Sequence, residues 1–268
     1  MDTLFSFRRF GLLVNRHFSL QWVNYLIGGL VYAGVLVLLF LMVLSARRDV
    51  FSSGEQLMVY LLAAYGGLFV YTTVIFRAYQ RPRHAAFHLL LPASTAEKFI
   101  LGWGLSLMWY TLCANGIYFL VRFFVVQYAE SHGFIVESLL QSDRLALLTS
   151  DDSGAMACFF VGLYLFVHAF TLLGSVWFRR HVAIKTALAL LVFILVYRYA
   201  YVLLGILLLP SDVSHSTFLP FIPSYMVADG VTYTISVGFS PGWIATYCLV
   251  ANGLLWFAAY YKLKEKEV

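Results

Sequence analysis

The chain has 268 residues, of which 62% are apolar, 18% are aromatic and only 12% are charged. Ordinary soluble domains carry about 25% charged residues, and one soluble core cannot cover this much apolar surface. Several uncharged runs reach about 20 residues, the length with which a helix crosses the hydrocarbon of a bilayer. The composition therefore excludes a water-soluble protein and predicts an all-α integral membrane protein, with a single transmembrane domain over residues 1–268.

The first 21 residues predict an amphipathic helix in the membrane interface rather than a signal peptide. Arginines interrupt the apolar residues, and no small-residue cleavage site follows them. On a helical wheel one stripe is apolar, and the basic and polar residues lie away from it, as expected of an interfacial helix. The stripe consists of Leu4, Phe7, Phe10, Val14 and Phe18, and the residues away from it are Arg8, Arg9, Asn15 and Arg16.

Six long apolar runs predict six membrane-spanning helices. We expect them at about residues 25–44, 57–76, 99–121, 155–178, 186–209 and 243–261. Ser240 and Pro241 suit the N-cap and first position of the sixth helix. The connection 210–240 contains FLPFIP, which is too short and too interrupted by proline to cross a membrane. We expect this connection to dip into the outer interface or to cap the bundle.

The connection between the second and third spans, which includes RPRHAAFHLLLPASTAEKFILGW at 81–103, combines basic, apolar and helix-capping residues. Ser94 and Glu97 fit a capping box, in which each side chain accepts a hydrogen bond from the other residue's backbone N–H. We expect a short helix over 81–91, a turn at Pro92 and a firmly started third span. An ordinary basic loop accounts for the charges, but it leaves the apolar residues of HAAFHLLLPAS unexplained, whereas a partner-docking surface accounts for both.

The distribution of charge predicts that both termini are cytoplasmic. Thirteen of the 18 Lys and Arg lie in the N-terminal segment, the second and fourth connections and the C-terminal segment, whereas nine of the 13 Asp and Glu lie on the opposite side. An excess of Lys and Arg marks the cytoplasmic side of a membrane protein. The net charge of +5 therefore reflects topology, and we expect no nucleic-acid partner.

The sequence lacks the usual catalytic and metal-binding patterns, so we expect neither an enzyme nor a metal site. It has no GxxxxGK[ST] phosphate loop and no HExxH motif. Its acidic residues lie in predicted loops and termini, although proton-coupled transporters usually need such groups within the bundle. Cys113, Cys158 and Cys248 fall in apolar runs, which is typical of small buried residues.

Polar residues within the predicted spans are candidates for a substrate path. Arg198 would cost about 2.5–3.5 kcal/mol at the bilayer centre. It either faces protein or a water-filled cavity, where it contacts a polar or anionic substrate, or it lies in the interface beside Tyr197, Tyr199 and Tyr201. His168 and Asn115 are isolated polar residues, for which interhelical hydrogen bonds are commoner than ligand binding. Arg122 directly follows the third span, and we expect its side chain to extend toward water.

Two stretches, FRRFGLLVNRHF at 7–18 and LLLPASTAEKFILGW at 89–103, resemble the permease subunits of type-2 ATP-binding-cassette exporters. The resemblance is especially to a small six-span group found in Bacteroidetes. It implies an elbow helix that includes Phe7, Arg8, Arg9, Phe10 and Arg16. It also implies a coupling helix that docks on a separate ATPase, with Ser94, Glu97 and Lys98 bracing the base of the third span. The docking residues are Arg81, Arg83, His84, Phe87, Leu90 and Leu91.

The same resemblance implies an exporter in the bacterial inner membrane. A separate nucleotide-binding subunit would bind the ATP, so this chain would need no cofactor, and two permease copies would assemble as a homodimer or pseudo-dimer. Two alternatives are a non-transporting membrane partner or assembly protein, and a secondary transporter that uses Arg198. Copurification with an ATPase would distinguish the exporter from both.

Overall fold

The computed structural model describes residues 6–46, 50–76, 94–137, 151–178, 180–208, 214–215, 224–228, 231–235 and 241–265. Six of its helices are long and apolar enough to cross a membrane, which confirms a multi-pass helical membrane protein. The helices are α1 (Phe7–Ala46), α2 (Ser53–Phe76), α4 (Thr95–Gly104), the π-helix η2 (Leu105–Trp109), α5 (Tyr110–Ser131), α7 (Asp151–Trp177), α8 (Val182–Leu208) and α9 (Pro241–Lys264).

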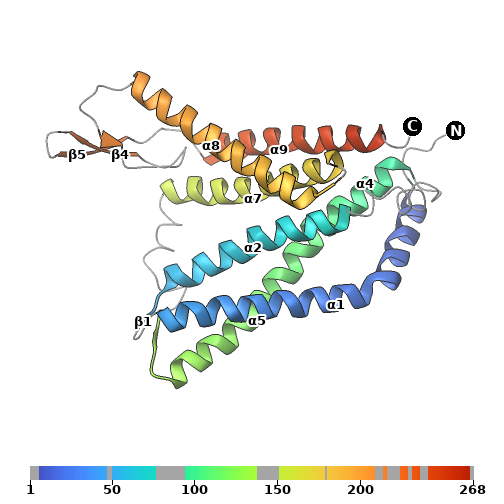
Figure 1. Ribbon diagram of the computed structural model, residues 1–268, viewed down its shortest axis with the longest axis horizontal. Helices are drawn as coiled ribbons and strands as arrows, with labels where there is room; N and C mark the ends of the chain where they lie inside the picture. Colours follow the sequence, from blue (N-terminus) through green and yellow to red (C-terminus); the bar gives the residue numbers. More distant parts are fainter. Residues whose placement is uncertain are drawn as a thin grey trace.

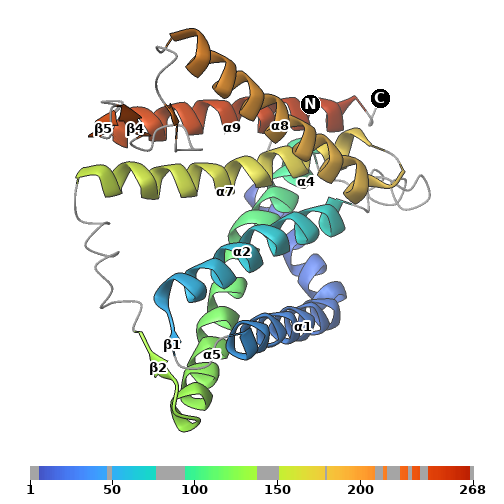
Figure 2. The ribbon, with the colours of Figure 1, turned by 60° about the vertical axis from the view of Figure 1, so that its left-hand side comes forward.

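The helices are arranged with α2 in the middle of the molecule. Both views place α7, α8 and α9 on one side of α2, and α1 and α5 on the other (Figures 1 and 2). α4, η2 and α5 follow one another without a break and form the third candidate span, Thr95–Ser131. The start of α1, the start of α4 and the end of α9 lie at the same end of the molecule (Figure 1).

Helix α1 is continuous, whereas the sequence predicts an interfacial helix that ends before a separate first span. Its 40 residues correspond to about 60 Å at 1.5 Å per residue, twice the roughly 30 Å of bilayer hydrocarbon. Its first turns point away from the rest of the helix and toward α4 (Figure 1). Ser19 Oγ donates to the carbonyl of Asn15 at 2.9 Å, a contact that often bends helices.

The face that the first turns of α1 present to the protein differs from the predicted apolar stripe. Phe10, Val14 and Phe18 are partly buried, as the stripe requires, but Phe7 is 84% exposed. Arg9, expected on the polar side, is partly buried. The difference arises because Arg9 has an ionic partner on α4, which draws it into the packed face.

The packing between α1, α2 and α5 depends on aromatic residues that meet a glycine. Leu36, Phe40, Phe51 and Tyr118 belong to a buried cluster at one end of these helices. Nearer the middle, a Cβ atom at Gly67 would lie only 3.0 Å from the Tyr32 ring and 3.1 Å from Tyr110 Cζ. A side chain at residue 67 would therefore displace the tyrosine rings that fill the space between these helices.

Short strands lie at the end of the bundle opposite the start of α4 (Figure 1). Strands β1 (Val50–Phe51) and β2 (Ile135–Val136) pair in parallel and join the α1–α2 connection to the chain after α5. Strands β3 (Ser214–His215), β4 (Ser224–Ala228) and β5 (Val231–Ile235) form an antiparallel sheet. The connection 210–240, for which the sequence predicts a cap or an interfacial dip, therefore contains a small sheet.

Candidate functional site

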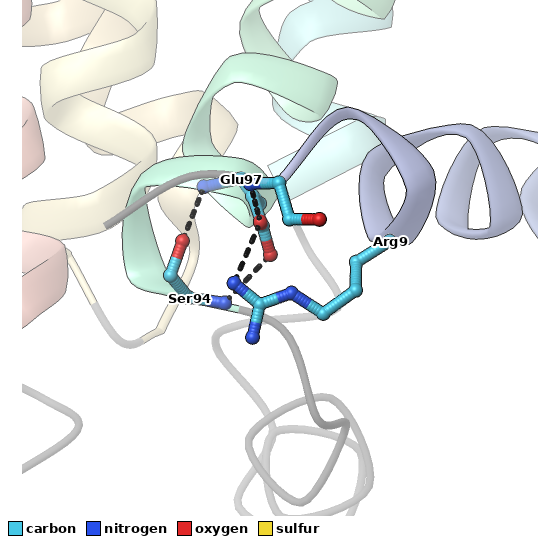
Figure 3. A network of polar contacts seen from close by, with 4 residues as sticks. Arg9, Ser94 and Glu97 are labelled. Carbon is cyan, nitrogen blue, oxygen red and sulfur yellow. Dashed lines mark hydrogen bonds and ion pairs between the residues drawn. The ribbon is translucent and has the colours of Figure 1, made fainter. Parts of the chain in front are cut away.

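Glu97 is the centre of a buried polar site at the start of α4 (Figure 3). Its side chain is 0% exposed. Glu97 Oε2 accepts from the Ser94 backbone N–H at 2.9 Å, and Ser94 Oγ accepts from the Glu97 backbone N–H at 3.2 Å. These reciprocal bonds confirm the predicted capping box, which satisfies backbone donors that the first turn of a helix leaves without partners.

The same carboxylate joins α4 to the start of α1. Glu97 Oε1 accepts from the Ser6 backbone N–H at 2.7 Å and from Arg9 Nη2 at 3.3 Å. A buried carboxylate is costly unless hydrogen bonds and an opposite charge compensate for its lost hydration, and these groups supply both. The two stretches that carry the family resemblance, some 90 residues apart in sequence, therefore meet at one side chain. We call Ser6, Arg9, Ser94 and Glu97 the Glu97 tie.

The remaining predicted residues of this region have different environments. Lys98 is buried beside Glu97, and Phe10 is partly buried. Arg8 and Arg16 are exposed on α1. The predicted coupling residues Arg81, Arg83, His84, Phe87, Leu90 and Leu91 lie outside the described residues.

A second polar feature follows one face of the third span. Its members are Ser106, Thr111, Asn115, Tyr118 and Arg122, and we call them the polar seam. Successive members are separated by five, four, three and four residues. In a regular α-helix a step of five residues would leave the face, but the π-helix η2 contains Ser106 and ends at Trp109, two residues before Thr111. The one extra residue of a π-turn restores the alignment.

At its end near α4, the seam connects three spans through His168, which is completely buried on α7. Trp256 Nε1 on α9 donates to His168 Nδ1 at 3.2 Å. An indole nitrogen can only donate, so His168 carries its proton on Nε2 and donates from there to Ser106 Oγ at 2.8 Å. Ser106 Oγ in turn donates to the Trp103 carbonyl at 3.2 Å. Every polar atom of the imidazole therefore has a partner.

In the middle of the seam, Thr111 and Asn115 link α5 to α7 and α2. The Thr111 and Tyr164 hydroxyls share a hydrogen bond of 2.8 Å. Asn115 Oδ1 accepts from the Tyr60 hydroxyl at 2.9 Å, and Asn115 Nδ2 donates to the Thr111 carbonyl at 2.7 Å. A groove of about 610 Å³ opens beside these contacts; its lining residues are Leu107, Met108, Thr111, Leu112, Asn115, Tyr164 and Leu165. Its lining is apolar except for a few uncharged hydrogen-bonding groups.

At its other end, toward the end of α5, the seam meets Gln56 of α2, which is fully buried. Tyr118 OH donates to the Gln56 carbonyl at 3.0 Å, and Arg122 Nε donates to Gln56 Oε1 at 2.8 Å. Gln56 Nε2 donates to the carbonyl of Glu137 at 3.0 Å. Arg122, expected to extend toward water, is partly buried and hydrogen-bonded within the protein instead.

Arg198 has a different setting from His168 and Asn115. It lies on α8, partly buried, between the exposed Tyr197 and Tyr199. His168 and Asn115 both belong to the interhelical hydrogen bonds of the third span, the commoner of the two roles considered from the sequence. Within the described ranges, no group of three His, Cys, Asp or Glu side chains is placed to hold a metal ion.

Sequence reasoning missed Ser106, a member of the seam, and several of its partners, including Gln56, Tyr60 and Tyr164. A signal was present, because polar residues recur along the third span at near-helical spacing. The π-turn concealed it, since a helical wheel with 100° per residue places Ser106 off the face of the others. Comparison of the chain with models of protein families, with curated proteins and with solved structures gave no match.

Proposed function

We propose that this chain is the permease subunit of an ATP-binding-cassette exporter that works with a separate ATPase. The observation that carries the proposal is the Glu97 tie, because it joins the two stretches on which the family resemblance rests. A permease of this kind must pass the movement of an ATPase to its spans. A rigid attachment at the base of a span serves that purpose, whereas a loosely solvated loop would absorb the movement.

In this proposal residues 81–91 form the cytoplasmic coupling helix, and the capping box fixes the angle at which the chain enters α4. Glu97 then carries the movement of the coupling helix into α1, since Ser6 and Arg9 bind the same carboxylate. The start of α1 and the base of the third span would move as one unit. A hinge between them would require a buried carboxylate to lose its donors, at a cost of about 1–3 kcal/mol for each unsatisfied group.

The polar seam would be the part of the bundle that rearranges when the coupling helix moves. It consists mainly of hydrogen bonds between uncharged side chains on different helices, which can exchange partners without exposing an ion to the membrane. Asn115, which lines the groove, contributes to the substrate path through this seam, and Arg198 contributes from α8, whereas the fully buried His168 joins the spans to one another. A second copy of the chain would complete the transporter as a homodimer in the inner membrane.

Copurification tests the proposal directly. The tagged full chain, extracted from its native membrane in a mild detergent, should retain a nucleotide-binding ATPase. Phe87→Ala with Leu90→Ala should reduce this retention sharply, because each buried apolar side chain contributes about 1.5–3 kcal/mol. Arg81→Glu with Arg83→Glu should have a smaller effect that shrinks as salt is raised, since exposed charges are screened.

Leu120→Ala with Phe123→Ala is the matched control, because it also removes one Leu and one Phe three residues apart, both exposed on α5 and outside the Glu97 tie. It should leave ATPase retention unchanged. Retention of the ATPase by the Phe87/Leu90 variant at the wild-type level would overturn the docking assignment. Absence of any ATPase from the wild-type preparation would favour the secondary transporter or assembly protein instead.

A further inference from the structure

Basic and aromatic side chains converge where α7 ends, α8 begins and α9 ends. Lys262 Nζ of α9 lies 5.0 Å from the centroid of the Trp177 ring. Lys185 Nζ of α8 lies 5.9 Å from the centroid of the next aromatic ring, Phe178. Cations from two helices are therefore placed over two consecutive aromatic residues, Trp177 at the end of α7 and Phe178 directly after it. We call Trp177, Phe178, Arg180, Lys185, Lys262 and Lys264 the basic cluster.

The charge of the basic cluster is largely uncompensated among the described residues around it. Arg180, Lys185 and Lys264 are exposed. Within the cluster, Lys262 Nζ forms an ion pair with Glu265 Oε2 at 2.6 Å, and both side chains are substantially exposed to solvent. An exposed pair of this kind is weak, so an anion of higher charge density could displace it.

The exposed apolar residues beside the cations indicate that the cluster lies at the membrane interface. Ile184 and Leu188 flank Lys185 on α8, and both have large exposed side chains. The Trp177 ring is 59% exposed. In a chain that crosses a membrane, such residues lie against lipid, and tryptophan favours the level of the headgroups. Lysines at that level extend their charged ends toward the headgroups while their stems remain in the apolar region.

We infer that the basic cluster binds the headgroup of an anionic phospholipid. The lipid phosphate would lie among Lys185, Lys262 and Lys264, and its acyl chains would follow the exposed faces of Trp177 and α8. Basic pockets between membrane helices are suited to phosphate headgroups of this kind. This inference does not rest on the proposed function, because it requires neither an ATPase nor a transported substrate.

The test uses the full chain, purified in a neutral detergent and titrated with cardiolipin, phosphatidylglycerol or phosphatidylcholine. Bound lipids are counted by native mass spectrometry, and thermal unfolding is followed by tryptophan fluorescence. The two anionic lipids should bind and raise Tm, whereas phosphatidylcholine should do neither. Lys185→Gln with Lys262→Gln should weaken anionic lipid binding about tenfold or more, since each Lys near an anionic lipid surface adds to the attraction and the variant lacks two.

Two variants separate this site from a general effect of charge. Lys185→Arg with Lys262→Arg should bind within about twofold of wild type, because both cations remain. Arg8→Gln with Arg16→Gln also removes two exposed cations, but away from Trp177, and should weaken anionic lipid binding much less than the Lys185/Lys262 Gln variant does. If the Gln variant does not fold, the salt dependence of wild-type binding decides: binding that is unchanged at 1 M salt contradicts the inference.

Four results would overturn the assignment. They are equal stabilisation by phosphatidylcholine, an equal Tm shift with inorganic phosphate alone, wild-type lipid binding by the Lys185/Lys262 Gln variant, and an equal loss of binding in the Arg8/Arg16 control. The second result would indicate a site for free anions, and the fourth would indicate general attraction by the basic end of the molecule.

Discussion

The hydrogen-bond donors that surround the Glu97 carboxylate differ in their exposure to solvent, and water can replace an exposed donor more easily than a buried one. The Arg9 side chain is 39% exposed, whereas the carboxylate is fully buried. Exposed ion pairs contribute about 0–1 kcal/mol, while hydrogen bonds to a buried charged group contribute about 1.5–3 kcal/mol. The backbone N–H groups of Ser6 and Ser94, rather than the arginine, should therefore account for most of the stabilisation by Glu97.

This difference predicts an order of effects at the Glu97 tie. Glu97→Ala should lower stability by about 2–3 kcal/mol, because it leaves backbone donors without a charged acceptor. Arg9→Gln should cost no more than about 1 kcal/mol, since the carboxylate keeps its backbone donors. Thermal unfolding of the purified variants in detergent measures both. A loss for Arg9→Gln equal to that for Glu97→Ala would assign the stabilisation to the ion pair instead.

Among the elements, the π-helix η2 determines which residues of the third span face the bundle. A π-turn is equivalent to one residue inserted into an α-helix. Met108, in η2, and Leu112, one turn later, are both exposed apolar residues, at 63% and 70% respectively. They differ in that only Met108 belongs to the turn that contains the extra residue.

Deleting each of these residues should have opposite consequences. Deleting Met108 should convert the π-turn into a regular α-turn, in which Ser106 and Thr111 become four residues apart and the seam stays aligned. Deleting Leu112 should rotate everything after it by about 100° relative to the preceding part, which separates Asn115 and Tyr118 from Tyr60 and Gln56. Gel filtration and thermal unfolding should show a folded protein for the first deletion and severe loss for the second. Equal damage by both deletions would show that η2 does not act as a one-residue insertion.

At the scale of the molecule, hydrophobic run length was sufficient to predict the six spans, because a bilayer requires long apolar helices irrespective of their partners. The capping box was also predictable, since its donors and acceptors lie within four residues of one another.

The bonds from Ser6 and Arg9 to Glu97 were not predictable, because neither residue carries a local signal of a partner some 90 residues away. The polar seam was hidden for a related reason: its alignment depends on one non-α turn. The strands β3, β4 and β5 lie before and after the run at 218–223, whose prolines excluded a span but gave no sign of a sheet.

The direction in which the bundle crosses the membrane is the remaining prediction at this scale, and the arrangement of the ends makes it testable. Ser153 lies near the start of α7, and the exposed Lys264 lies at the end of α9. These two helix ends are at opposite ends of the bundle (Figure 1). Thirteen of the 18 Lys and Arg lie in segments on the side of Lys264, so the positive-inside rule places Lys264 in the cytoplasm and Ser153 outside.

Single cysteines at these positions test the orientation. In a background from which Cys113, Cys158 and Cys248 have been replaced, a membrane-impermeant maleimide applied to intact spheroplasts should label Ser153→Cys but not Lys264→Cys. Lys264→Cys should react only after the membrane is permeabilised, which also shows that its thiol is accessible. The charge distribution is strong enough that we expect one orientation rather than a mixture, because the excess of cations recurs in four separate segments. Labelling of both positions from the outside would mean that an even number of helices crosses the membrane between them, instead of the three helices α7, α8 and α9, and the six-span topology would then be wrong.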